Sequence, residues 1–315
     1  MAAAQPAAAP AAGRAEPNHG LRILLIWLPL ALAADLVIWF VWGPHLPPGD
    51  MSDTAASQQF DIRVMSVMAA PVVLAVLVYC GYAMITWRPR AGGEDEDGPP
   101  IEGNSKVQAS WITVTTVLVL GLFVFGFVEL ASPPGAGSGQ GISPLWKPGG
   151  TPLQVQVIGQ QWLFTYRYPQ YGGFETTDLV LPAGQPVQFN VTSLDVIHSF
   201  WAYQLGVKAD ANPQVNNIAY TTPEHTGQFT VRCAELCGLW HGAMYDYGRV
   251  LSVAAFRSWA RTTETRMAKI TRTLPSYALV YYPNEIAGLA KFYYEAGLPG
   301  AGGGFYGNQY YPDEP

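Results

Sequence analysis

Three stretches of the chain are apolar over the length of a membrane-spanning helix. They cover residues 23–42, 64–87 and 107–128. The second and third contain no charged residue, and the first contains only Asp35. A helix of about 20 apolar residues crosses a hydrocarbon core of about 30 Å. The pattern therefore predicts three transmembrane helices, of which the last two form a helical hairpin within residues 60–130.

The first apolar run has a second interpretation. Arg14 and Arg22 precede it, and a cluster of small residues in its second half resembles the cleavage site of a signal peptide, which would remove residues 1–34. Because the apolar run continues well beyond that point, we favour a retained additional helix over residues 21–43. Residues 1–20 are rich in alanine and proline and are predicted to be a flexible tail.

The positions of lysine and arginine predict how these helices are oriented. The loop between the first two helices holds only Arg63. The segments before the first helix and between the second and third hold Arg14, Arg22, Arg88, Arg90 and Lys106. Cytoplasmic loops of membrane proteins are enriched in these residues. Three crossings from a cytoplasmic N-terminus then place everything after Glu129 on the outer side.

Short β-prone runs with turn residues between them follow a Pro/Gly/Ser-rich linker at residues 131–150. The runs fall at residues 153–168, 178–181, 187–192, 217–222, 227–232 and 247–253. The run from Val187 alternates apolar and polar residues, which is typical of a strand with one buried face. This spacing predicts an antiparallel β sandwich or barrel over residues 151–253.

The segment after this domain, residues 254–315, divides into two parts. Residues 256–270 have the spacing of one amphipathic helix of about four turns. The remainder is rich in tyrosine and glycine and contains no C-x-x-C-H motif, so we expect no covalently attached c-type haem. This extension is either an aromatic anchor for a partner protein or a mobile tail.

The composition agrees with a chain that is part membrane and part globular. Of 315 residues, 49% are hydrophobic and only 13% are charged. The net charge of −6 argues against nucleic acid as a partner and favours a basic protein. Cys80 lies within an apolar run, where we expect a buried, inert thiol.

Five sulfur and imidazole donors occur in or near one short segment. Cys233, Cys237, His241 and Met244 lie within 12 residues, and His198 lies 35 residues before Cys233. Such soft donors select copper, zinc or iron. A closed zinc site would use both cysteines and both histidines but would leave Met244 without a role. Two coppers bridged by both thiolates would use every donor, and a disulfide between the cysteines is a third interpretation.

The segment from Cys233 fits the pattern C-x-E-x-C-G-x-x-H-x-x-M, and that from Val196 fits V-x-H-S-F/W. Residues 159–166, GQQWLFTY, fit G-x-Q-W-x-W/F-x-Y. In these motifs and in residues 206–210, the chain resembles subunit II of the haem-copper cytochrome c oxidases. The resemblance spans about residues 60–253. It implies a membrane α-helical N-terminal part followed by an all-β cupredoxin-like Greek-key barrel.

The resemblance also implies a role for each residue of the motif. It implies a binuclear copper A centre. The thiolates of Cys233 and Cys237 would bridge the two metals, and His198 and His241 would each bind one of them. Met244 would be a weak axial ligand, and Glu235 would supply its backbone carbonyl. Trp162 would be the aromatic residue that receives electrons from cytochrome c, although a strand Trp is also an ordinary core residue. The Glu235 side chain would bind magnesium or manganese at the interface with subunit I, in the neighbourhood of Asp210.

The function implied by the resemblance is that of subunit II in a terminal, proton-pumping cytochrome c oxidase. Such a subunit accepts electrons from soluble or membrane-bound cytochrome c and passes them to haem in subunit I for oxygen reduction. Its place is the plasma membrane of a prokaryote, as a multi-pass protein with the copper domain on the periplasmic side. Quinol oxidases share the fold but lack the copper ligands that are complete here. The alternative is a membrane-anchored copper carrier or assembly protein.

The charge of the β domain affects how it would meet cytochrome c. Acidic residues outnumber basic ones by seven to four over residues 151–252, and an acidic surface would steer a basic cytochrome towards the domain.

At the start of the second hairpin helix, the family usually has the motif L-E-x-x-W-T-x-x-P, whereas this chain has Val107-Gln108. Because an amide does not titrate, the proton route that uses the family's Glu is in doubt here.

Overall fold

The computed structural model describes residues 17–88, 103–132, 140–141 and 143–271. Residues 1–16, 89–102, 133–139, 142 and 272–315 lie outside the described residues. Several sequence predictions therefore concern segments that the structure does not describe. These are most of the N-terminal tail, the charged loop between the second and third helices, the middle of the linker and the Tyr/Gly-rich extension.

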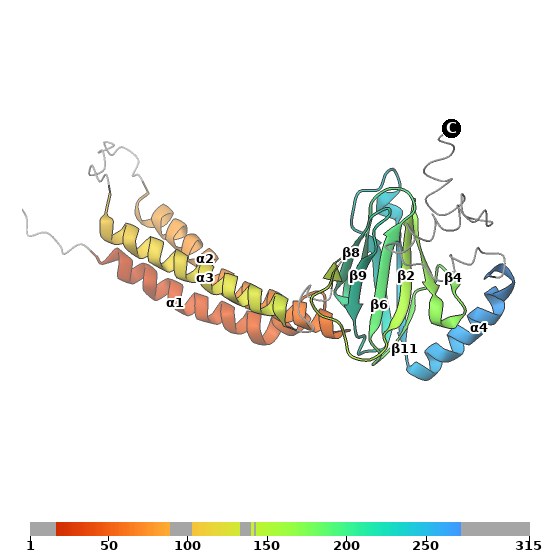
Figure 1. The fold of residues 1–315 in the computed structure, drawn as a ribbon. Helices are drawn as coiled ribbons and strands as arrows, with labels where there is room; N and C mark the ends of the chain where they lie inside the picture. Colours follow the sequence, from red (N-terminus) through yellow and green to blue (C-terminus); the bar gives the residue numbers. More distant parts are fainter. Residues whose placement is uncertain (1–16, 89–102, 133–139, 142, 272–315) are drawn as a thin grey trace, which may run out of the picture. The chain divides into compact units, whose positions relative to one another are not determined.

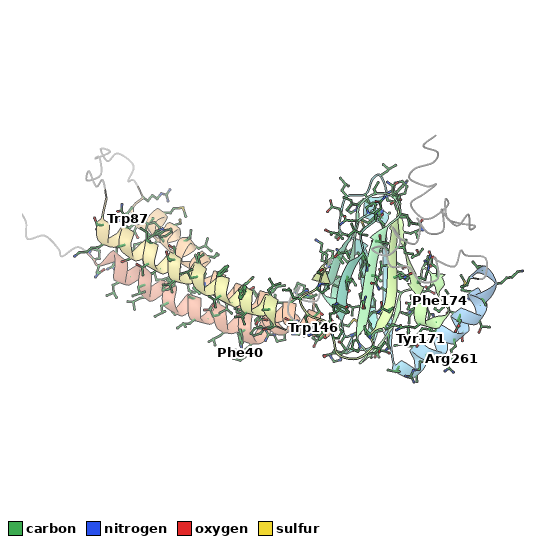
Figure 2. The ribbon with its side chains drawn as sticks, in the orientation of Figure 1. Phe40, Trp87, Trp146, Tyr171, Phe174 and Arg261 are labelled. Carbon is green, nitrogen blue, oxygen red and sulfur yellow. The ribbon has the colours of Figure 1, made fainter. Side chains whose placement is uncertain are left out.

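Each of the three apolar runs is helical (Figure 1). The helices are α1 His19–Val37, continued by the π-helical turn η1 Ile38–Trp42 and the 3₁₀ turn η2 Gly43–His45, α2 Asp53–Thr86, α3 Ser105–Ala131 and α4 Val253–Thr271. Among the described residues, three helical spans are long and apolar enough to cross a membrane: His19–His45, α2 and α3. Large apolar side chains project from these helices, and Phe40 and Trp111 are each 70% exposed (Figure 2). Such exposure suits contact with lipid.

The chain divides into two compact units, one containing residues 1–43 and 63–101 and the other containing residues 44–62 and 102–315. In the first unit, polar groups connect α1 to α2. The Trp27 indole donates a hydrogen bond of 2.8 Å to the Pro71 carbonyl, and the His19 ring is hydrogen-bonded to the Tyr82 hydroxyl at 2.7 Å. The Arg63 guanidinium lies 5.4 Å from the centre of the Trp39 ring. These contacts fix the pairing of the two helices.

The second unit contains two β-sheets with a shared core. The strands are β1 Gln140–Gly141, β2 Leu153–Gln160, β3 Leu163–Tyr168, β4 Phe174–Thr176, β5 Val180–Pro182, β6 Val187–Ser193, β7 His198–Ala202, β8 Val207–Ala211, β9 Asn217–Thr221, β10 Gly227–Cys233 and β11 Tyr245–Leu251. The six-stranded sheet has the order β1-β9-β6-β2-β3-β4, and the five-stranded sheet has the order β5-β11-β10-β7-β8. Alternate residues such as Val155, Phe189, Phe200 and Val231 point between the sheets and are buried. This one-sided burial explains the period-two pattern of the sequence.

The strands differ from the sequence prediction in three ways. The run at residues 153–168 forms two strands, β2 and β3, which reverse at Gln161–Trp162. The sheets are mixed, because β2 pairs with β6 and β5 pairs with β11 in parallel. The strands β1, β4, β7 and β8 were not predicted, and β1 lies within residues 131–150, which were predicted to be a linker. In β8 the buried positions after Val207 are alanines, so its hydrophobic alternation is weak.

The beginning of α2 belongs to the same unit as the sheets and is hydrogen-bonded to residues of the β domain. Asp53 Oδ1 accepts hydrogen bonds from the backbone N–H of Thr54 at 2.7 Å and of Thr222 at 2.8 Å. The Ser52 hydroxyl donates to the Leu205 carbonyl at 2.8 Å, and Gln58 donates to the Gly206 carbonyl at 2.6 Å. The helix therefore starts 11 residues before the apolar run at residue 64 begins, because its first turns contact protein rather than form an apolar span.

Candidate metal centre

The candidate ligands come together because two strand ends meet at one end of the β domain. Strands β7 and β10 are antiparallel, with Phe200 opposite Cys233, so the beginning of β7 lies beside the end of β10. His198 is the first residue of β7 and Cys233 is the last of β10. The loop that follows returns to β11, and it is closed by a 3.0 Å hydrogen bond from the Cys233 N–H to the Met244 carbonyl.

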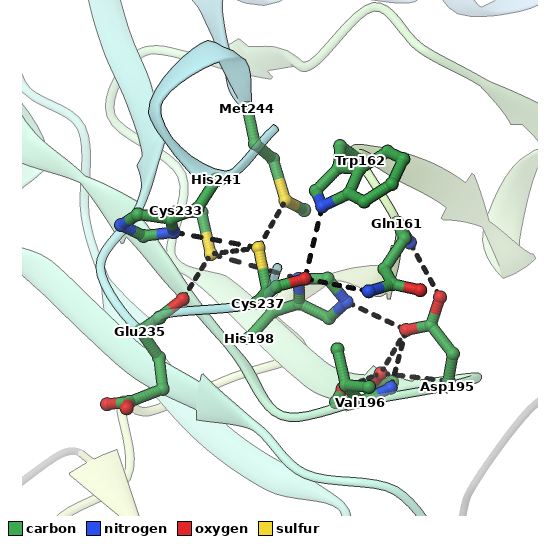
Figure 3. Close-up of polar contacts among 11 residues, drawn as sticks. Gln161, Trp162, Asp195, Val196, His198, Cys233, Glu235, Cys237, His241 and Met244 are labelled. Atoms are coloured by element: carbon green, nitrogen blue, oxygen red, sulfur yellow. Dashed lines mark hydrogen bonds and ion pairs between the residues drawn. The ribbon is translucent and has the colours of Figure 1, made fainter. Parts of the chain in front are cut away.

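All six predicted donor groups face one point (Figure 3). The Cys233 and Cys237 sulfurs are 3.7 Å apart. His198 Nδ1 lies 3.8 Å from the Cys233 sulfur, and His241 Nδ1, on the short helix η5 His241–Ala243, lies 3.6 Å from the Cys237 sulfur. The Met244 thioether lies 3.7 Å from the Cys237 sulfur. The donor atoms of His198, Cys233 and Cys237 all lie within 4.8 Å of one another.

Glu235 contributes two groups that face different ways. Its backbone carbonyl oxygen lies 3.2 Å from the Cys233 sulfur. Its side chain is exposed, and the carboxylate points away from the sulfurs (Figure 3). The main chain and the side chain of this residue are therefore available to two different partners.

The donors lie in a largely dry environment. His198 is fully buried, and Cys233, Cys237 and Met244 are between 2% and 8% exposed. Both cysteines are free thiols, so the alternative of a disulfide is not realised in this structure. A buried pair of soft sulfur donors that is flanked by two imidazoles and a thioether suits copper, because thiolate, thioether and imidazole are the ligands copper prefers.

The two thiols ionise very differently when no metal is bound. Burial raises the pKa of Cys233, but hydrogen bonds from His198 and from backbone groups outweigh it and bring the pKa to about 6. Burial and the neighbouring Cys233 raise the pKa of Cys237 to about 12. Burial lowers the pKa of His198, but its contacts with Cys233 and Asp195 give a net increase. One thiolate therefore forms easily, and the second proton stays until a cation replaces it.

A carboxylate behind His198 fixes the direction of its ring. Asp195 Oδ1 lies 2.8 Å from His198 Nε2, which leaves Nδ1 directed at the sulfurs. The other oxygen, Oδ2, accepts a 2.6 Å hydrogen bond from the Gln161 N–H. Sequence analysis did not assign a role to Asp195. The available signal was its position three residues before the histidine, in a turn where it also accepts from the Val196 N–H at 2.7 Å.

Trp162 lies against the loop that carries the ligands. Its indole N–H donates a 3.1 Å hydrogen bond to the Cys237 carbonyl, which also accepts a 2.8 Å bond from Gln161 Nε2. Trp162 is partly exposed and also packs against the core. The side chain therefore joins the surface of the domain to the backbone of a candidate ligand.

Two glycines permit this close packing. A Cβ atom at Gly159 would lie 3.1 Å from His198 Cδ2. Gly238 has a φ of +110°, and a Cβ there would lie 2.9 Å from Gln161 Nε2. The φ of Gly238 favours glycine, and a side chain at Gly159 would press against the candidate ligand His198.

Known proteins match the chain over this domain and beyond it. The family model described as cytochrome c oxidase subunit II, periplasmic domain, matches residues 174–246. Cytochrome c oxidase subunit 2 of Synechocystis is 29% identical over 301 residues, which cover 83% of this chain and 88% of the relative. That of Bacillus subtilis is 31% identical over 244 residues, covering 71% and 65%. The chain is therefore similar to cytochrome c oxidase subunit II over the β domain and over most of the length of these relatives.

A solved structure gives a further likeness. The periplasmic domain of subunit II of cytochrome oxidase from Bradyrhizobium japonicum is 32% identical and covers 36% of this chain and 94% of that chain, with a TM-score of 0.35. The predicted order of apolar helices followed by an all-β domain is confirmed, and the family model that matches this β domain is that of the subunit II periplasmic domain. The family match spans all six donor residues, whereas Trp162 precedes it.

Proposed function

We propose that this protein is the electron-accepting subunit of a cytochrome c oxidase, which takes electrons from cytochrome c at a binuclear copper A centre and passes them to haem in subunit I for oxygen reduction. The similarity to cytochrome c oxidase subunit II supports this role. The observation that carries it is the pair of sulfurs 3.7 Å apart, each with its own imidazole nitrogen within 3.8 Å. Such an arrangement can give each of two metal ions both sulfurs and one imidazole, whereas a mononuclear copper site needs only one Cys.

Each donor would have a distinct task. Cys233 and Cys237 would bridge the metals, and His198 and His241 would each bind one of them. Met244 lies near Cys237 and the Glu235 carbonyl near Cys233, so each would complete a different side of the pair. The copper pair supplies one-electron transfer when it is bound. The protein keeps the donors fixed, so that few atoms move when the charge changes.

Trp162 would form the point where electrons reach the domain from cytochrome c. Its ring is partly exposed, and its N–H reaches the Cys237 carbonyl. Replacing Trp162 with alanine should slow the oxidation of cytochrome c without loss of copper. Full-rate oxidation by Trp162→Ala would contradict this role, and an unchanged copper absorption spectrum is the control for an intact site.

The partners follow from the same role. We propose that the domain docks on subunit I and other oxidase subunits and meets cytochrome c at its surface. The exposed Glu235 carboxylate would reach a magnesium or manganese ion at the interface with subunit I, because carboxylate oxygen suits such hard cations. The location would be the plasma membrane of a prokaryote, with three membrane-spanning helices and the copper domain on the outer side.

Copper quantification together with electron spin resonance tests the proposal. The purified protein should hold two coppers per chain that share one unpaired electron. A single copper, or zinc in its place, would contradict the electron-transfer role. Two coppers without a shared electron would favour a membrane-anchored copper carrier or assembly protein instead.

A further inference from the structure

The outer face of the five-stranded sheet carries a row of aromatic and basic side chains. The residues that alternate with this row, such as Phe200 and Val231, belong to the core, so the row points away from the other sheet. The strand register places four of its members side by side across β8, β7, β10 and β11, in the order Lys208, Trp201, Arg232 and Tyr245. Tyr247 and Arg249 follow on the same side of β11. We call these six residues the aromatic-basic face.

The aromatic rings of this face contact their neighbours and still remain accessible. The centre of the Trp201 ring lies 5.0 Å from that of the Tyr203 ring, and the Lys208 ammonium lies 5.8 Å from the centre of the Trp201 ring. Tyr245 and Tyr247 are 57% and 52% exposed. The face is also hollowed by a groove, which is lined by Trp201, Tyr203, Gln204, Thr230 and Arg232. Trp, Tyr and Arg are enriched at the centres of protein interfaces, so the composition of this face is that of a docking surface.

The charge of the face is opposite to that of the β domain as a whole. Residues 151–252 contain four basic residues, and the one outside the face, Arg167, is buried and ion-paired. The other three are exposed, all belong to the face and make no ion pair within the described residues: Lys208, Arg232 and Arg249. Of the seven acidic residues in this range, only Asp210 occupies an outward strand position of the same sheet. A basic surface therefore lies on a domain in which acidic residues predominate.

We propose that the aromatic-basic face binds an acidic surface of another oxidase subunit. This inference rests on the proposed function, since it takes the chain to be part of an oxidase complex. Exposed cations without a partner in their own domain attract carboxylates, and the neighbouring tyrosine rings would exclude water from the pairs so formed. The same cations would repel a basic cytochrome c. The face is accordingly not the proposed point of electron entry, Trp162, which lies in the turn between β2 and β3 of the other sheet.

Photo-crosslinking in the purified oxidase complex identifies what the face contacts. p-Benzoylphenylalanine would replace Tyr247 on the face or, as the control, Thr262 on the exposed side of α4. Mass spectrometry should find crosslinks from position 247 to another oxidase subunit, beside Asp or Glu residues, and none to that site from position 262. Crosslinks from position 247 only to cytochrome c, to a second copy of this chain or within this chain would overturn the proposal, and so would the absence of any crosslink.

Charge reversal tests whether carboxylates hold the partner. Lys208→Glu combined with Arg249→Glu should lower the yield of the crosslink from position 247 about tenfold, because like charges would then face each other. Arg257→Glu combined with Arg261→Glu makes the same change in net charge at exposed positions of α4 and should leave the yield unchanged. An unchanged yield in the first double variant, or an equal loss in both, would overturn the proposal. Electron spin resonance of the same complexes tests the proposed function separately, because none of these residues is a candidate copper ligand.

Discussion

At the scale of single residues, Asp195 connects the candidate ligand His198 to the turn that carries Trp162. One carboxylate oxygen faces the His198 ring and the other accepts from the Gln161 backbone. A carboxylate behind a histidine fixes its tautomer and strengthens it as a donor. The residue therefore supports both the metal centre and the proposed route of electrons towards it.

We predict that Asp195→Asn weakens copper binding about tenfold to hundredfold. The reduction potential of the centre should rise, because a less basic His198 stabilises the oxidised metal less. Competition titration and potentiometry measure the two effects. Asp178→Asn, which removes the same charge from an exposed loop, is the control and should change neither. An unaltered potential in Asp195→Asn would contradict the positioning role.

The ionisation of the two thiols predicts how copper binding depends on pH. With a pKa of about 6, Cys233 is mostly a thiolate at pH 7, whereas Cys237, with a pKa of about 12, keeps its proton. Binding both sulfurs as thiolates must release the Cys237 proton. The apparent copper affinity should therefore increase about tenfold from pH 7 to pH 8. Chelator competition at the two pH values measures this, and an affinity independent of pH would show that no proton leaves.

At the scale of elements, the sequence predicted strands that carry several large apolar residues in alternation and missed strands that are short or have small residues at inward positions. The alternation from Val187 identified β6, because Val and Phe fill its inward positions. Strand β8 has alanines there and was missed. The start of α2 was also missed, because Asp53 and its neighbours are polar and are held by hydrogen bonds to residues of the β domain more than 150 positions away.

We predict that the first turn of α2 stabilises the β domain. Asp53→Ala should lower the free energy of unfolding of the domain by about 1–2 kcal/mol, because it removes the acceptor for the Thr54 and Thr222 amides. Loss of the copper absorption in denaturant measures domain unfolding. Asp50→Ala, three residues earlier at an exposed bend, is the control. Equal midpoints for the two variants would mean that α2 is not a support of the domain.

At the scale of the whole molecule, the proposed electron transfer from cytochrome c requires that the β domain lies on the outer side of the membrane. The three apolar helical spans permit this topology, and the lysine and arginine positions favour it. The helices and the domain then have separate tasks, because the spans fix the chain in lipid and the domain collects electrons from outside.

We predict that a membrane-impermeant maleimide labels Ser258→Cys in spheroplasts and does not label Gly103→Cys. Ser258 lies on α4 after the third span, and Gly103 lies before it. Both residues are exposed, so detergent should make the two labelling rates similar. Mass spectrometry of the labelled peptides distinguishes them from native cysteines. Labelling of Gly103→Cys alone would reverse the proposed orientation.

The kinds of element and the donor set follow from the sequence alone. Apolar runs of spanning length specify helices in any environment without water, and the spacing of Cys233, Cys237, His241 and Met244 places four soft donors on one loop. Which groups lie behind and beside those donors depends on how the chain folds. The fold brings His198 to them through the pairing of β7 with β10, sets Asp195 behind its ring, and places the Trp162 indole against the Cys237 carbonyl. These contacts join residues that are distant in sequence, and no local pattern specifies which strands will pair.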